Sequence, residues 1–210
     1  MGISERRVRE REERRRVILE AAKKVFLEKG IEHATMRDVA AEAELSKAAL
    51  YLYFKNREEL TFELLHISFS KIKQVMQIAA SQDEDGFYKL KASGDAFMRF
   101  YREEPEYIYF SLIIERYSYS IANNLPAAKE CLELIHEIQN IIEQLLSQGV
   151  QDGSIRQDID VEKTAVVFIH VSTSFMQRVS TMQETLAKDE RYESNELIDH
   201  MFTIFLYSLR

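Results

Sequence analysis

A short run after residue 45 carries side chains that suit contacts with a polyanion. Ser46 is followed by Lys47, two alanines, and then Tyr51 and Tyr53. A cation and two phenols can bind phosphate oxygens, and small alanines let a helix sit deep in the major groove beside thymine methyls. The alternative is that both tyrosines cover a core and that Lys47 is merely solvated.

Side chains that would indicate catalysis or metal binding are scattered along the chain. The five histidines are dispersed, and none lies at metal-ligand spacing from another. The single cysteine, Cys131, excludes an intramolecular disulfide and a thiolate metal cluster. A phosphate-binding glycine loop and a Gly-x-Ser-x-Gly elbow are both absent from the sequence. We therefore expect no enzyme activity, no metal and no cofactor.

Charge is distributed unevenly along the 210 residues. The net charge of the chain is −7. Residues 1–57 hold 14 of the 28 Lys and Arg and 10 of the 35 Asp and Glu, so their net charge is +4, whereas that of the remaining residues is −11. A small basic head on a large acidic body is typical of a DNA-binding module joined to a solvated domain. The arginine-rich start is not a signal peptide, and no run of apolar residues is long enough to span a membrane. We expect a cytoplasmic protein.

The first 60 residues predict four helices in a characteristic order. Apolar residues at helical spacing predict a helix over about 14–29, with Gly30 at its left-handed cap. Thr35 and Asp38 form a variant capping box before a short helix over about 36–43. Ser46 opens a two-turn helix through residue 53, and Asn56 caps a long helix.

Two short helices joined by a tight turn and braced by longer ones have the arrangement of a helix-turn-helix. Leu50 and Phe54 would hold the second short helix on the first long one. The outer face would then present a set that has no obvious structural purpose: Lys47, Ala48, Ala49, Tyr51 and Tyr53.

The rest of the chain predicts a helical bundle, because it contains only two prolines, few glycines and many good helix formers. We expect an all-α protein with a DNA-binding domain over residues 1–60 and a second domain over 61–210. The last two helices, about 161–186 and 193–209, are apolar on more than one side and must bury a second face.

The run from Thr35 to Leu60, TMRDVAAEAELSKAALYLYFKNREEL, resembles the signature of TetR/AcrR-type regulators, and the resemblance covers residues 14–60. It implies a homodimer whose last two helices form a four-helix interface, and a helix-turn-helix that binds palindromic operator DNA as two half-sites about 34–36 Å apart. It also implies repression, which is the family's usual mode.

The resemblance also implies residue roles. Thr35, Tyr51, Tyr53 and Arg57 would hold phosphates, with Lys55 as a further candidate, while Arg37 and Lys47 would reach base edges. Three positions depart from the family pattern: Glu44 stands in a turn that usually has Gly, Ala48 replaces a frequent Gly, and Ala49 replaces a frequent Thr or Ser. These changes leave the fold unaffected but weaken any inference about base reading.

The N-terminal tail alternates seven arginines, between Arg6 and Arg16, with four glutamates. It is either an arm that follows the minor groove or a self-neutralising extension of the first helix.

A cavity in the second domain would bind a hydrophobic or aromatic small molecule. Its candidate lining is an aromatic-rich set that is equally suited to plain core: Phe97, Phe100, Tyr101, Phe110, Tyr117, Phe168, His170, Phe175 and Met176.

The function expected is that of a repressor released from DNA by a small-molecule ligand. Two alternatives stay open: a ligand-independent DNA-binding activator or architectural protein, and a helical enzyme or adaptor whose head has lost DNA binding.

Overall fold

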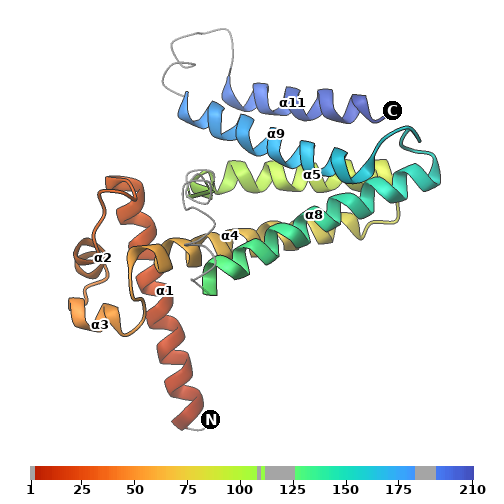
Figure 1. The fold of residues 1–210 in the computed structure, drawn as a ribbon. Helices are drawn as coiled ribbons and strands as arrows, with labels where there is room; N and C mark the ends of the chain where they lie inside the picture. The colour runs from red at the N-terminus through yellow and green to blue at the C-terminus, as the bar shows by residue number, and fades with distance from the viewer. Residues whose placement is uncertain (1–2, 108–109, 112–125, 183–192) are drawn as a thin grey trace.

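The described part of the chain is all-helical in a computed structural model (Figure 1), as the sequence predicts. The structure describes residues 3–107, 110–111, 126–182 and 193–210. Within these ranges the helices whose bounds are established are α1 (Ile3–Lys29), α2 (Met36–Glu42), α3 (Lys47–Tyr51), α4 (Arg57–Ala80), α5 (Gly86–Glu103), α8 (Pro126–Asp152), α9 (Val161–Thr181) and α11 (Ser194–Ser208).

Each short helix of the head starts at a side chain that satisfies its free backbone N–H groups. The Thr35 Oγ1 accepts from the Asp38 N–H at 3.2 Å, and the Thr35 N–H donates to the Asp38 carboxylate at 2.9 Å, which completes the expected capping box. Ser46 Oγ accepts from the Ala49 N–H at 3.1 Å. Asn56 caps α4 as predicted. Local sequence therefore sets where these helices begin.

Two turns of the head adopt left-handed backbone geometry. Gly30, after α1, has φ of 78°, which glycine adopts at no steric cost. Glu44, between α2 and α3, has φ of 54°, so a residue with a Cβ occupies a position that suits glycine better. The turn of the helix-turn-helix therefore places Glu44 in the left-handed region that glycine favours.

Helix bounds differ from expectation at two places in the head. Helix α1 begins at Ile3 rather than near Arg14, so the arginine-rich tail is a helical extension of α1. Helix α3 ends at Tyr51 rather than Tyr53, and the Leu52 N–H bonds back to Ala49 O in a tighter final turn.

The body consists of a lower group of helices and an upper pair (Figure 1). Helices α4, α5 and α8 pack against one another, and α9 lies side by side with α11. The start of α5 comes very close to the end of α8: a Cβ added to Gly86 would lie 2.1 Å from the backbone N of Gly149. Glycine is therefore required at residue 86.

Helix α4 belongs to both parts of the molecule. Leu60 and Leu64 are buried near the head, while Ile72 and Met76 are buried in the body. The boundary expected after residue 60 lies inside this continuous helix, so no linker separates head from body there.

Candidate DNA-binding surface and effector cavity

Helix α3 buries Leu50 and presents Lys47, Ala48 and Tyr51 outward. Leu50 is fully buried, and Phe54, just beyond the helix, is buried too. Lys47 and Ala48 are exposed, and Tyr51 is 43% exposed. The Lys47 Nζ lies 5.6 Å from the centroid of the Tyr51 ring, so the cation and the phenol occupy one surface. This surface has the donors that phosphate oxygens require.

Two of the residues expected on the outer face of this helix are less accessible to solvent. Ala49 and Tyr53 are half-buried, and Tyr53 packs against the head's core. Leu52 is instead 77% exposed, although the sequence analysis did not select it. An apolar side chain beside Tyr51 is suited to a thymine methyl in the major groove. In the sequence, the position of Leu52 between two tyrosines, shortly after the buried Leu50, could have indicated this role.

The start of α2 carries one exposed cation and an occupied cap. Arg37 is exposed, in keeping with contact to a base edge. The Thr35 hydroxyl already donates to the Asp38 carboxylate at 2.7 Å. Hydrogen bonds from Lys29 and Thr35 hold the pKa of Asp38 well below its usual range, so this carboxylate is ionised at neutral pH.

Arg57 performs a task inside the head that the sequence analysis did not anticipate. Its Nη1 donates to the backbone carbonyls of Ile31 at 2.7 Å and Glu32 at 2.8 Å, and its side chain is largely shielded from solvent. The guanidinium therefore ties the loop between α1 and α2 to the start of α4. Lys55, two residues earlier, is exposed.

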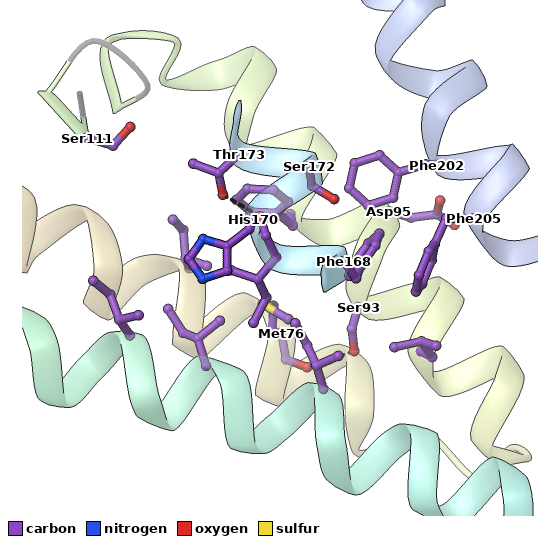
Figure 2. A pocket seen from close by; sticks show the side chains of 18 of the residues that line it. Met76, Ser93, Asp95, Ser111, Phe168, His170, Ser172, Thr173, Phe202 and Phe205 are labelled. Carbon is purple, nitrogen blue, oxygen red and sulfur yellow. Dashed lines mark hydrogen bonds between the residues drawn. The ribbon is translucent and has the colours of Figure 1, made fainter. Parts of the chain in front are cut away.

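A cavity of about 220 Å³ lies in the body between the lower helices and the α9–α11 pair (Figure 2). Its wall is mainly apolar and comes from α4, α5, α8, α9 and α11. The principal apolar lining residues are Phe69, Ile72, Met76, Leu90, Phe97, Tyr107, Ile135, Ile138, Ile142, Phe168, Phe202, Phe205 and Leu206. Such a wall fits an extended apolar ligand.

Polar groups of the cavity wall are mostly satisfied within the protein. Ser93 Oγ donates to Met76 O at 3.3 Å, and the Lys91 ammonium pairs with Asp95 at 2.6 Å. Burial raises the pKa of Tyr107, which keeps its phenol neutral. His170 is exposed at the cavity, and in Figure 2 its ring projects from α9 on the side away from Phe202.

Only part of the predicted lining set reaches this cavity. Phe97, Phe168 and His170 line it. The remaining described residues of the set are not among those that line this cavity: Phe100, Tyr101, Phe110, Phe175 and Met176. Tyr117 lies outside the described residues.

Helices α4 and α11 also contribute lining that the sequence pattern does not reveal. Ile72 and Met76 were visible as the buried row of a long helix, but nothing in that row distinguishes a cavity wall from ordinary core. Phe202 and Phe205 face Phe168, whose ring stacks on Phe205 with centroids 3.8 Å apart.

One segment touches both the cavity and the head. Tyr107 and Ser111 line the cavity, while Phe110 packs edge-on to Phe26 of α1 with ring centroids 6.4 Å apart. Glu106 pairs with Lys23 of α1. Burial lowers the pKa of Lys23, but the hydrogen bond and charge of Glu106 outweigh it, so the pKa is raised.

Apolar side chains remain exposed along α9 and α11. Val167 is 57% and Val171 52% exposed on α9, and Ile204 is 57% and Tyr207 75% exposed on α11. These large side chains form an exposed apolar surface at helical spacing on two adjacent helices.

Metal binding and membrane insertion find no support in the described parts of the chain. No cluster of three or more His, Cys, Asp or Glu side chains there has the arrangement of a metal site. No helix there has the length and apolarity needed to cross a membrane.

Comparison with known proteins agrees with the geometry of the head. Residues 18–64 match the model of the family described as bacterial regulatory proteins, tetR family. The chain is 26% identical over 151 residues to the fatty acid metabolism regulator protein of Bacillus subtilis (strain 168), covering 69% of this chain and 72% of that protein. It is 28% identical over 153 residues to the transcriptional repressor KstR2 of Mycolicibacterium smegmatis, covering 71% of each chain.

Solved structures share the whole fold. FadR of Bacillus subtilis, solved in complex with stearoyl-CoA, aligns with a TM-score of 0.70 at 19% identity, covering 92% of this chain and 98% of that chain. The regulator PfmR of Thermus thermophilus aligns with a TM-score of 0.68 at 23% identity, covering 90% and 97%. With its capped helix-turn-helix, exposed α3 face and matching family model, the chain is a DNA-binding transcriptional regulator of the TetR family.

Proposed function

We propose that this regulator represses transcription as a homodimer on a palindromic operator and leaves DNA when an apolar ligand fills the body cavity. The observation that carries the proposal is a set of neighbouring contacts: Tyr107 and Ser111 line the cavity, while Glu106 and Phe110 contact α1. Relatives that bear the name of repressor, KstR2 and BepR, support the sign of regulation.

The DNA surface follows from exposure on α2 and α3. Lys47 and Arg37 would reach base edges, Leu52 would contact thymine methyls, and Tyr51 and Lys55 would hold phosphates. Thr35 and Tyr53 remain proposed phosphate contacts, each with part of its side chain already used inside the head. Ala48 and Ala49 allow close approach, and Arg57 positions the loop rather than the DNA.

The α9 and α11 surface supplies the dimer contact. Val167, Val171, Ile204 and Tyr207 would meet their copies in a four-helix interface. A Val171→Asp variant that stays dimeric in analytical ultracentrifugation would contradict this. We keep the division into a DNA-binding part over residues 1–60 and a ligand-binding and dimerisation part over 61–210, with α4 crossing it.

The ligand class follows from the cavity wall. A mainly apolar lining with few free polar groups favours a long hydrocarbon or a flat apolar ring system. FadR was solved with stearoyl-CoA, and its fold matches this chain, which supports an acyl thioester as the first ligand to test.

Release would act through the spacing of the two heads. A ligand that pushes Tyr107 and Ser111 would move Phe110 and Glu106 against α1. The dimer would then hold its α3 helices too far apart or too close for successive major grooves. A liganded structure with unchanged head spacing would rule this out.

The test measures binding to a fluorescent duplex from the region upstream of the chain's own gene, beside a scrambled duplex, at two salt concentrations. We expect tight, salt-sensitive binding that prefers the native duplex. The Lys47→Ala/Tyr51→Ala variant should lose at least about 10-fold in affinity, since each good base contact is worth about 1–3 kcal/mol. The matched control, Lys129→Ala/Tyr88→Ala, removes the same residue types from exposed sites on the body and should bind normally.

The effector is tested in the same assay. Stearoyl-CoA should weaken operator binding by about 5- to 150-fold, the usual range of allosteric coupling, whereas coenzyme A alone should not. An Ile138→Trp variant, with its cavity partly filled, should bind DNA and ignore the acyl thioester. Operator binding that no acyl thioester changes would favour a ligand-independent regulator. Equal binding of both variants and the wild type to either duplex would indicate a head without DNA function.

A further inference from the structure

The N-terminal half of α1 carries a row of arginines in line with its buried face. Arg7, Arg11 and Arg14 are spaced by four and three residues, and the same 4-3 spacing continues without interruption into the core residues Ile18, Ala21 and Val25. Residues at this spacing share one side of a helix. The arginine row, residues 7, 11 and 14, is thus the outward continuation of the side of α1 that packs on the head.

Carboxylates pair with three of the other arginines and leave this row free. Arg6 Nε lies 2.9 Å from Glu10, and Arg16 Nη2 lies 2.6 Å from Glu13. Arg15 pairs with Glu63 of α4. Within the residues that the structure describes, no member of the arginine row forms an ion pair or a side-chain hydrogen bond, and all three are exposed. The extension is therefore only partly self-neutralising.

The row faces the side of the head that carries the helix-turn-helix. Arg15, the next residue after the row, has its guanidinium 4.6 Å above the ring of Phe54, just beyond α3. Figure 1 shows α1 running past α3 and away from α9 and α11. The part of α1 before the first buried residue, residues 3–17, extends over about 22 Å at 1.5 Å per residue. It spans roughly 6 base pairs at 3.4 Å each.

We propose that the arginine row binds backbone phosphates of the duplex next to the half-site that α3 reads. The inference rests on the proposed DNA binding and adds a second contact surface to it. Three unpaired guanidinium groups on one face suit phosphate oxygens, and a formed helix presents them without the entropy cost of ordering a tail. Because phosphates carry no base identity, the row adds affinity without sequence preference.

The test compares two triple variants that each remove three charges per chain. Arg7→Gln/Arg11→Gln/Arg14→Gln removes the row, and Arg6→Gln/Arg9→Gln/Arg16→Gln removes arginines that lie outside the row on other sides of α1. Glutamine keeps helix propensity, and circular dichroism checks that both variants fold. The readout is the slope of log affinity against log salt concentration, on the upstream duplex and on a scrambled duplex of equal length.

We expect the row variant to lower the salt slope by about 5, at about 0.9 per phosphate contact for six contacts in a dimer, and the control variant by less than about 1. Affinity should fall by the same factor on both duplexes, so operator preference survives. On a duplex cut at the outer edges of the half-sites, the two variants should behave alike.

Each other outcome overturns the inference in a recognisable way. Equal loss in both triple variants would mean that only net charge matters. An unchanged slope in the row variant, with binding still lost in Lys47→Ala/Tyr51→Ala, would leave the proposed function intact and remove the row from it. If the wild-type chain binds neither duplex, the proposed function and the inference both fail.

Discussion

The head and the body of this protein differ in how completely their interiors are packed. In the head, α2, α3 and α4 each begin at a side chain that caps them, Thr35, Ser46 and Asn56. In the body, Asp85 and Asp160 likewise cap α5 and α9, whereas α11 follows Glu193 with no side-chain cap, and the helices enclose a cavity of about 220 Å³. Local caps therefore start helices in both parts, and what sets the body apart is the volume that its packing leaves open.

This difference matches what each part has to do. A surface that reads DNA must hold Lys47 and Tyr51 in one geometry, and closed packing around Leu50 provides that rigidity. A part that responds to ligands needs volume that packing does not fill, and unfilled volume costs contacts. The body therefore gives up stability where the head does not.

The largest expected effect comes from opening the closed core of the head. Phe54 is fully buried, so Phe54→Ala should cost about 3–5 kcal/mol of unfolding free energy. Phe97→Ala, at the half-buried cavity wall, should cost less than half as much, because its ring already borders empty space. Urea denaturation followed by circular dichroism measures both, and equal costs would remove the contrast between head and body.

A smaller effect tests the local capping of the head. Thr35→Ala removes the cap of α2 and should cost about 1 kcal/mol, whereas Thr35→Ser keeps the hydroxyl and should cost little. In the body, Glu193→Ser should instead stabilise α11 by up to about 1 kcal/mol, since it supplies a missing cap. Thermal denaturation measures the stability of the three variants. A Thr35→Ala variant as stable as the wild type would show that tertiary packing alone determines where α2 begins.

The smallest effect concerns Gly94 of α5, and Gly86 of the same helix provides the contrast. A Cβ at Gly94 would meet the Phe202 ring at an ordinary 3.5 Å, so Gly94→Ala should raise stability by about 0.5–1 kcal/mol and reduce the space for a ligand. Gly86→Ala, with its clash at Gly149, should destabilise. The melting temperature reports the change in stability, and titration with stearoyl-CoA reports the loss of ligand space. A Gly94→Ala variant with a lower melting temperature than the wild type would show that the cavity wall has no room to relax.

The sequence predicted the head in detail because its determinants are close together in the chain. The capping pairs Thr35 with Asp38 and Asn56 with Glu59 are three residues apart, and the Gly30 turn follows directly on its helix. Arg57 marks the limit of such local prediction. Its side chain donates to backbone carbonyls 26 and 25 residues away in the chain, and no spacing rule predicts partners at that separation.

The cavity was predicted poorly because its determinants are distant. Phe97 and Phe100 both lie on α5 in an apolar row, yet Phe97 lines the cavity while Phe100 packs on Tyr107 with ring centroids 5.7 Å apart. Which apolar side chain meets space and which meets core depends on how α9 and α11 sit on α5. A periodic pattern identifies the buried face of a helix without showing where that face is left unfilled.

The continuity of α4 has a consequence for exchanging parts between related regulators. A chimaera that joins this head to another body must be spliced inside a helix, so the joint has a rotational phase as well as a position. One residue added or removed in the middle of α4 would turn the head by about 100° and shift it by about 1.5 Å relative to the cavity. DNA-binding heads can therefore be exchanged between such proteins only when the joint preserves the helical register of α4.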